Sequence, residues 1–259
     1  MTQALTLSRD GEIAELVINQ PSKRNAMSYE MWEALPKVVA EVDADESVKV
    51  LVVRGAGDHF CAGADISEFE TRRATAEGAR RYGEHVEHAA HSLGEMRKPS
   101  IAMIKGFCIG GGLEIALACD LRFAATTATL GITPAKLGLV YSFSSTRQLV
   151  TAVGPSFAKY ILFSGERLSA QEALRVHLVD QLVEPERLEA RTLEFASTIC
   201  SRSQVSVRGA KRIIEKIAAG MDLPDEEAAE LPITSVDSED YKEGVRAFLE
   251  KRPPLFRVR

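Results

Sequence analysis

The alternation of apolar and polar residues near the N-terminus predicts a strand pair followed by a helix. Residues 4–10 (ALTLSRD) and 12–19 (EIAELVIN) alternate in this way, and Asp10-Gly11 between them is typical of a tight turn. Ser28 then opens a segment whose apolar positions recur at helical spacing. Because serine is a favoured N-cap residue, we expect that helix to begin directly after Ser28.

The next part of the chain alternates apolar strands with helices. Residues 48–57, 100–106 and 120–126 read as buried strands, while residues 75–96 and 111–119 have helical periodicity. Strands that are apolar on both faces and separated by helices indicate a largely parallel sheet with crossover helices. The predicted fold class is therefore α/β.

After about residue 145 the strand signal fades and helical patterns dominate. Helices are expected within the segments 155–165, 169–177, 185–199, 203–220 and 238–252. The charged, proline-bearing stretch 221–232 is interpreted as a break between the last two helices. We therefore expect an α/β core over residues 1–200, followed by a helical region over residues 201–259.

Composition limits the classes of function. With 259 residues, 45% of them hydrophobic, the chain suits one large domain or a domain with an appendage. A net charge of −5 disfavours nucleic acid as a partner. The chain lacks a signal-peptide pattern and a long apolar run, so no membrane span is expected. Four cysteines without a CxxC pair suit reduced thiols in a cytoplasmic protein.

One motif, GFCIGGGLEIALACDL (106–121), places three glycines between a predicted strand and a predicted helix. Glycine lets a backbone N–H approach a ligand closely, and the first N–H groups of a helix have no intrahelical partner. Such groups can stabilise a developing oxyanion. A tight turn with close packing is the alternative reading of Gly110, Gly111 and Gly112.

A second loop of small residues, HFCAGADISEF (59–69), also follows a predicted strand. Open α/β sheets bind ligands at the carboxyl ends of their parallel strands. The two loops could each supply one N–H to the same oxygen.

Together these two motifs resemble the crotonase superfamily, the enoyl-CoA hydratase/isomerase family. The resemblance extends over nearly the whole chain and includes PSKRNAMS (21–28), SGERLSAQEAL (164–174) and EDYKEGVRAFLEKRPPLF (239–256). It implies a crotonase-like fold of repeated ββα units and an acyl-CoA thioester substrate, with no cofactor besides the coenzyme A of the substrate. It also implies a homotrimer or a homohexamer, with residues 201–259 serving oligomerisation and covering the active site.

The resemblance also implies the catalytic groups. The backbone N–H groups of Ala64 and Gly111 would hold the thioester oxygen, and Glu114 would activate a water. Burial beside Leu113 and Ile115 would raise the pKa of Glu114 toward neutrality, which suits acid–base work. A carboxylate that only compensates the helix dipole is the alternative reading of Glu114.

The sequence departs from the usual hydratase pattern at one point. Thr133-Pro134-Ala135 stands where hydratases carry a Pro-Glu pair, so the second carboxylate is missing. In one possible mechanism, Glu114 activates the water while Tyr141, or a second water, supplies the other proton transfer. In another, because residues 133–141 are similar to methylmalonyl-CoA decarboxylase, Tyr141 orients a substrate carboxylate.

Two further alternatives remain. An enoyl-CoA isomerase generally needs the absent second glutamate, which weakens that reading. A non-catalytic acyl-CoA-binding subunit is suggested by the missing carboxylate, while the retained Glu114 argues against it. A metal site at His85, His88 and His91 is disfavoured because known zinc signatures use other spacings.

Contacts to coenzyme A complete the expectations that come from the resemblance. Lys23, Arg24 and Ala26 match a turn near the nucleotide, and Lys251 matches a lysine that often approaches the phosphates, sometimes from a neighbouring subunit. The remaining candidates for substrate or coenzyme A contact are Ala62, Ala64, Asp65, Ile66, Gly110, Gly111 and Pro134.

Overall fold

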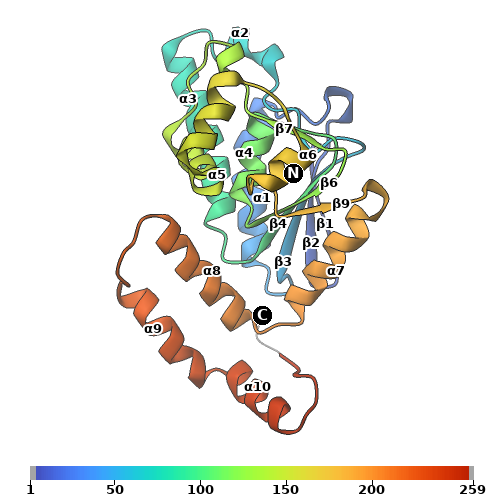
Figure 1. Cartoon of the computed structure of the whole chain (residues 1–259), viewed down its shortest axis with the longest axis vertical. Coiled ribbons are helices and arrows are strands. Elements are labelled where there is room, and N and C mark those ends of the chain that lie inside the picture. Colours follow the sequence, from blue (N-terminus) through green and yellow to red (C-terminus); the bar gives the residue numbers. More distant parts are fainter. Residues whose placement is uncertain (1–3, 257–259) are drawn as a thin grey trace.

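The computed structural model describes residues 4–256 and contains two sheets surrounded by helices (Figure 1). The larger sheet has the strand order β1-β2-β3-β4-β6-β9, and only β1 runs antiparallel to its neighbour. Its strands are β1 (Leu5–Asp10), β2 (Ile13–Ile18), β3 (Val50–Gly55), β4 (Ser100–Ile104), β6 (Leu121–Ala125) and β9 (Gln181–Val183). The predicted α/β class and the N-terminal strand pair are confirmed.

A second, smaller sheet has the order β5-β7-β8. Its strands are β5 (Phe107–Ile109), β7 (Thr129–Gly131) and β8 (Leu168–Ser169). Each has only two or three residues, too few for a periodic pattern to be visible in the sequence. The two sheets together give the repeated ββα units of the expected crotonase-like fold.

Helices cover both faces of the larger sheet (Figure 1). They are α1 (Tyr29–Ala44), α2 (Phe69–Arg72), α3 (Ala76–Gly94), α4 (Gly111–Ala118), α5 (Phe143–Ser164), α6 (Ala170–Arg175) and α7 (Leu188–Cys200). Ser28 caps α1 as expected, since its side chain accepts a hydrogen bond from the N–H of Met31. Helix α5 is kinked at Gly154, where φ is 75° and Pro155 follows.

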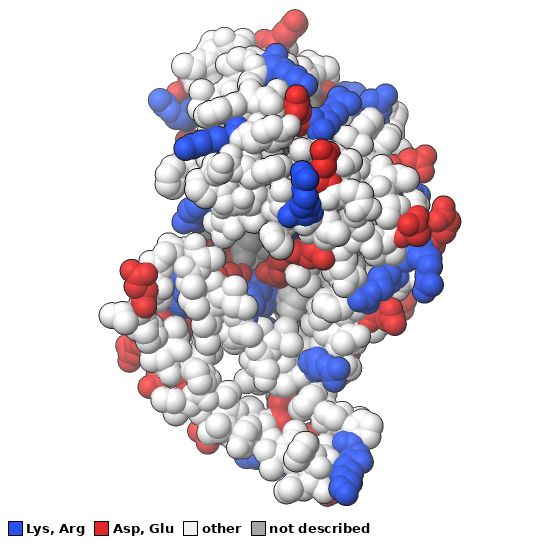
Figure 2. All heavy atoms as spheres, viewed as in Figure 1, with Lys and Arg blue, Asp and Glu red and all other residues white. Residues whose placement is uncertain are grey.

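Three more helices extend away from this body: α8 (Gln204–Ala218), α9 (Glu226–Thr234) and α10 (Glu239–Leu249). The molecular surface is hollowed between them and the rest of the protein (Figure 2). The expected division at residue 200 coincides with the end of α7. Residues 1–3 and 257–259 of the two expected sections lie outside the described residues.

Two expectations about the second half of the chain are wrong. Strands do occur after residue 145, because β8 and β9 add to the edges of the two sheets. The stretch 221–232 is not only a break, since α9 begins within it at Glu226. Asp225 caps that helix by accepting a hydrogen bond from the N–H of Ala228, and Pro232 lies inside it. The cap outweighs the helix-breaking composition of the segment.

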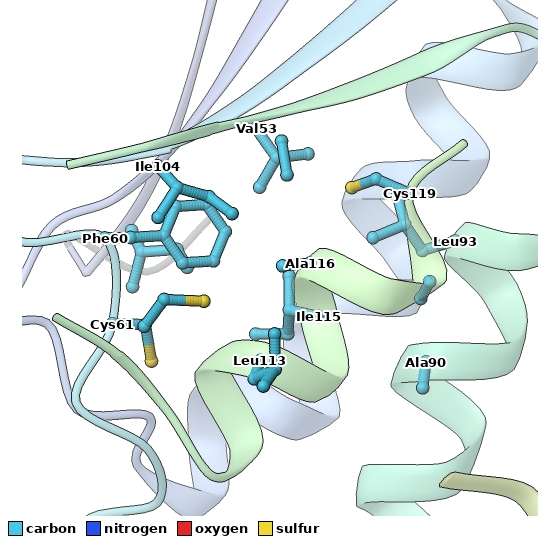
Figure 3. Close-up of a cluster of buried hydrophobic side chains, with 14 of the residues drawn as sticks. Val53, Phe60, Cys61, Ala90, Leu93, Ile104, Leu113, Ile115, Ala116 and Cys119 are labelled. Carbon is cyan, nitrogen blue, oxygen red and sulfur yellow. The ribbon is translucent and has the colours of Figure 1, made fainter. Parts of the chain in front are cut away.

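The core positions α4 at the centre of the molecule. Alternate residues of the parallel strands face opposite sides, so that Leu51 and Val53 join one apolar cluster while Val50 and Val52 join another under α7. Figure 3 shows the apolar side chains that gather around α4, from Val53, Phe60, Cys61, Ala90, Leu93, Ile104, Leu113, Ile115, Ala116 and Cys119. This packing fixes the direction of α4 and therefore of its N-terminus.

The four thiols are buried and free of disulfides. Burial raises the pKa of Cys61 and of Cys119 to about 12, so both stay protonated at neutral pH. Cys61 packs in the core. Between residues 4 and 256, no helix combines the length and apolar character that crossing a membrane requires.

Candidate functional site

Two loops at the carboxyl ends of β3 and β4 run side by side. Cys61 and Cys108 form an isolated parallel bridge, in which the N–H of Cys61 donates to Phe107 O at 2.9 Å and the N–H of Ile109 donates to Cys61 O at 3.0 Å. These bonds hold residues 61–64 against residues 109–112. The two motifs are therefore neighbours in the fold, and the expectation that each supplies one N–H to the same oxygen stays a prediction.

Glycine is required at this junction for two separate reasons. Gly110, which precedes the first turn of α4, has φ 54° and ψ −119°, a backbone conformation that residues with a Cβ rarely adopt. A Cβ on Gly112 would lie 2.3 Å from the carbonyl oxygen of Cys61. The chain could not make this close approach with any larger residue at position 112.

The amides of Ala64 and Gly111 face the same space. A Cβ added at Gly111 would lie 3.6 Å from Ala64 N, so the two N–H groups are close together. Within residues 4–256, neither N–H donates a hydrogen bond to a protein atom. Both residues line a cavity of about 310 Å³, together with Glu114. Two unpaired donors at the mouth of a helix are therefore available to a ligand oxygen.

Glu114 lies one turn inside α4 and is 5% exposed. Burial, helped by the charge of Glu87, raises the pKa of this carboxyl to about 7 against the opposing effect of hydrogen bonds from Ser145 and Tyr141. A carboxyl that titrates near neutrality can act as either acid or base. Capping does not explain its position, because its carboxylate accepts bonds from side chains of other elements.

Tyr141 reaches the same carboxyl from the loop before α5. Its hydroxyl lies 3.3 Å from Glu114 Oε2 and 3.3 Å from the carbonyl oxygen of Gly110. Burial raises the pKa of the Tyr141 phenol well above its usual value, so the hydroxyl keeps its proton at neutral pH. The sequence-based expectation that Tyr141 and Glu114 act on the same substrate is consistent with this contact.

A serine that the sequence reasoning assigned no role also contacts Glu114. Ser145 is buried, and its hydroxyl donates to Glu114 Oε1 in a short hydrogen bond. Ser142 caps α5 and its Oγ lies 2.8 Å from Ser145 Oγ. No signal in the sequence distinguishes Ser145, because serines at the start of a helix are ordinary candidates for capping it.

No carboxylate stands at Thr133-Pro134-Ala135, where the sequence lacks the Pro-Glu pair of hydratases. Thr133 and Pro134 line the cavity, whereas Ala135 is exposed in the 3-10 helix Pro134–Lys136. The second carboxylate on the cavity wall instead belongs to Glu87 of α3. Periodicity alone could not identify Glu87, because it is one of several charged residues on that helix.

The residues expected to contact coenzyme A separate into two groups. The first group lines the cavity and consists of Ala62, Ala64, Ile66, Gly110, Gly111 and Pro134. The second group lies beside it and consists of Lys23, Arg24, Ala26 and Asp65. Lys23 Nζ pairs with Asp65 Oδ2 at 2.5 Å, and Arg24 lies over the ring of Phe107 with 5.4 Å to its centroid. Ala26 is buried and its carbonyl accepts from Gln20.

Asp65 has a structural role in its own loop. It is 6% exposed and accepts bonds from the N–H and hydroxyl of Ser67 as well as from Lys23. Burial acts to raise the pKa of this carboxyl, but the bonds from Lys23 and Ser67 prevail and hold it below its usual value. Asp65 therefore anchors Lys23 and the start of the 3-10 helix that carries Ile66.

Lys251 is not brought to the cavity of its own chain. It follows α10, which lies at the opposite end of the molecule from α2 and α3 (Figure 1). The residues that line the cavity all fall between Trp32 and Ser145, so residues 201–256, the described part of the helical region, do not line this site in their own chain. A role for Lys251 requires a neighbouring subunit.

Arg73 is a cationic residue on the cavity wall that the sequence reasoning missed. Its guanidinium lies 4.6 Å from the ring centroid of Phe69 and 5.1 Å from that of Tyr82.

The histidines of α3 do not form a metal site with other residues: in the part of the chain that the structure describes, no group of three or more His, Cys, Asp or Glu side chains could hold an ion.

Comparisons with known proteins agree with this geometry. Residues 8–259 match the family described as enoyl-CoA hydratase/isomerase. The short-chain-enoyl-CoA hydratase of Clostridium acetobutylicum is 35% identical, over 95% of this chain and 94% of that protein. The crotonyl-CoA hydratase of Syntrophomonas wolfei is 34% identical, over 97% of each chain. A solved structure of an enoyl-CoA hydratase/isomerase family protein from Hyphomonas neptunium is 43% identical, with a TM-score of 0.97 over 100% of this chain and 99% of that one.

Proposed function

Because the chain belongs to the enoyl-CoA hydratase/isomerase family, we propose that it adds water across the double bond of a 2-enoyl-CoA thioester. The observation that carries this proposal is the convergence of Glu114 and two unpaired amides on one cavity. The similar proteins named as hydratases of short-chain enoyl-CoA and crotonyl-CoA support the same substrate class.

The two amides stabilise the charge that develops on the substrate. The thioester oxygen accepts from the N–H groups of Ala64 and Gly111, and addition of hydroxide to the β-carbon turns the thioester into an enolate. Donors aimed at that oxygen bind the enolate more strongly than the neutral carbonyl, so they lower the barrier.

Glu114 performs the proton transfers. As a carboxylate it takes a proton from the water whose oxygen attacks the β-carbon, and as an acid it then protonates the α-carbon. Both halves of water end on the substrate, and Glu114 returns to its starting state. The hydrogen bonds from Ser145 and Tyr141 hold the carboxylate in one orientation during both steps.

The rate of hydration is expected to rise with pH and to level off above an apparent pKa near 7. The reason is that Glu114 must start as a carboxylate, while burial raises its pKa to about 7. The measurement is a profile of kcat/KM for crotonyl-CoA between about pH 5 and pH 9. A rate that stays flat across this interval, as expected for a glutamate with the ordinary pKa of 4.5, would contradict this role.

Decarboxylation is the second candidate, and the contacts of Tyr141 argue against it. A tyrosine that orients a substrate carboxylate needs a hydroxyl that is free for it, but this hydroxyl lies within 3.3 Å of both Glu114 Oε2 and Gly110 O. The assay that separates the two functions compares crotonyl-CoA, followed by loss of enone absorbance, with methylmalonyl-CoA, followed by release of CO2. We expect hydration alone, and CO2 release that fails in Tyr141→Phe would favour the alternative.

Coenzyme A is part of the substrate, and the proposed reaction needs no resident cofactor. We propose that Arg73, Lys23 and Arg24 attract its phosphates, since all three are basic groups in or beside the cavity.

Buried free thiols support a reducing compartment such as the cytoplasm.

We propose further that the protein assembles as a homotrimer or as a homohexamer made of two trimers. Large apolar side chains are exposed along the last three helices and the segments that join them: Ile214, Ile217, Leu223, Ile233, Val236, Tyr241, Val245, Phe248, Leu249 and Leu255. Such a concentration of exposed apolar surface is typical of an interface. Assembly would also allow Lys251 to approach the cavity of another subunit.

Replacing Phe248 by aspartate is expected to shift the protein toward monomers. Phe248 is 83% exposed in the single chain, and a charge would be buried without a partner at the interface. Sedimentation velocity gives the mass, and circular dichroism checks that the helices persist. A wild-type protein that sediments as a monomer would contradict the proposed assembly.

A further inference from the structure

A continuous series of hydrogen bonds connects Glu114 to a second carboxylate. Ser145 Oγ donates to Glu114 Oε1, and Ser145 Oγ lies 2.8 Å from Ser142 Oγ. Ser142 Oγ lies 3.0 Å from Ser144 Oγ, and Ser144 Oγ donates to Glu87 Oε1 at 2.7 Å. The series thus consists of two carboxylates joined by three hydroxyls, and we call it the serine chain.

The two ends of the serine chain lie in different environments. Glu114 is 5% exposed, whereas Glu87 is exposed and stands on the wall of the cavity. The three serines belong to the first turn of α5 and its cap, while Glu87 belongs to α3. Ser142 and Ser145 also line the cavity, so the serine chain runs along the cavity wall from the buried carboxyl of Glu114 to the exposed carboxyl of Glu87.

The serine chain needs one proton for each of its hydrogen bonds. It has four links, namely Glu114–Ser145, Ser145–Ser142, Ser142–Ser144 and Ser144–Glu87. Each hydroxyl supplies one proton, so three serines fill only three links when both carboxylates are ionised. A fourth proton, carried by either carboxyl group, fills the last link. The two placements of this proton are the start and the end of a proton transfer along the chain.

We propose that the serine chain is a proton path that lets Glu114 exchange its proton with solvent while the acyl group occupies the cavity. This inference rests on the proposed function, in which Glu114 is the only carboxylate at the reacting carbons. During hydration Glu114 regains its starting state by passing its proton to the α-carbon, and the path offers that proton a second route, which leads to solvent. Glu87 is the solvent end of this route, and it acts on Glu114 through the serines.

The transfer is balanced at every step. The proton on Glu114 Oε1 moves to Ser145 Oγ as the proton of Ser145 moves to Ser142. The proton of Ser142 moves to Ser144, and the proton of Ser144 moves to Glu87 Oε1. Glu114 becomes a carboxylate, Glu87 becomes an acid, and Glu87 then exchanges with water. No bond to carbon changes, and no other reactant is needed.

Isotope exchange tests this path directly. In deuterated water, Glu114 takes the α-proton from 3-hydroxybutyryl-CoA. The path lets that proton leave and a deuteron arrive before the enolate is reprotonated. Mass spectrometry then measures deuterium in recovered 3-hydroxybutyryl-CoA relative to crotonyl-CoA formed, at low conversion so that rehydration contributes little. The wild-type protein is expected to incorporate deuterium.

Three variants locate the path. Ser144→Ala interrupts it, and Glu87→Gln keeps a hydrogen-bond partner for Ser144 that cannot take up a proton. Each is expected to lower the ratio of exchange to dehydration by about tenfold, while KM changes little. The control is Glu84→Gln, which removes the same charge from α3 at an exposed position away from the cavity and is expected to leave the ratio unchanged.

The outcomes separate this inference from the proposed function. An unchanged ratio in both Ser144→Ala and Glu87→Gln, or a wild-type protein that incorporates no deuterium, would overturn the path. Deuterium incorporation that fails in these two variants, without any crotonyl-CoA being formed, would instead contradict the hydratase activity and retain the path.

Discussion

Replacing Glu114 by glutamine is expected to lower kcat for hydration of crotonyl-CoA by roughly a thousandfold, within the range for loss of a general acid–base group. Glutamine keeps the shape of the side chain, and its single oxygen can still accept from either Ser145 or Tyr141, which donate to different oxygens of Glu114. It cannot take a proton from water. The loss is therefore expected in kcat, with little change in KM, and steady-state kinetics measure both.

The thermal stability of Glu114→Gln shows whether a loss of activity reflects a loss of folding. Because the folded state raises the pKa of Glu114 from 4.5 to about 7, wild-type stability falls as the pH rises through that interval. Glutamine cannot ionise, so the variant does not lose this stability at high pH. Its thermal midpoint at pH 8 is therefore expected to equal or exceed that of the wild type. A stable variant that keeps a tenth or more of the wild-type kcat would contradict the role of Glu114.

Replacing Gly111 by alanine is expected to lower hydration by about a hundredfold or more, as loss of one oxyanion donor does. The new Cβ would lie 2.8 Å from Trp32 Cζ2 and 3.6 Å from Ala64 N, in the space where the thioester oxygen must sit. Trp32 is 1% exposed and its indole N–H lies 3.2 Å from Tyr82 Oη, so the ring cannot move aside freely.

The matched control for this variant is Gly209→Ala on α8. A Cβ at Gly209 would meet nothing within 4 Å, so neither activity nor stability is expected to fall. Binding of coenzyme A by calorimetry separates a blocked cavity from an unfolded protein. If Gly111→Ala hydrated crotonyl-CoA at the wild-type rate, these two amides could not be the oxyanion donors.

Local signals of sufficient length were enough to predict much of this fold. Residues 50–53 and 101–104 are continuous apolar runs, and Ser28 marks the start of α1 with a chemically specific cap. Strands such as β9 could not be predicted, because its three residues are held in place by pairing with β6 and not by a pattern of their own. Tertiary contacts outweighed local propensity there.

The candidate site divides in the same way. Glu114 and the two glycine-bearing loops lie in continuous motifs, so the sequence could identify them. The partners of Glu114 could not all be found from the sequence, since Glu87 is 27 residues away and its hydrogen-bonded connection to Glu114 passes through the serines at the start of α5. Which charged residue of α3 faces the cavity depends on how that helix packs against α4.

The most direct test of the proposed chemistry is incubation of the wild-type protein with crotonyl-CoA in water labelled with oxygen-18. We expect 3-hydroxybutyryl-CoA that carries one labelled oxygen on the β-carbon, with the thioester intact. Mass spectrometry of the intact product and of its acyl fragment locates the label. Label found only in free crotonic acid would indicate thioester hydrolysis, and crotonyl-CoA that remains unlabelled and unchanged would contradict hydration by this site.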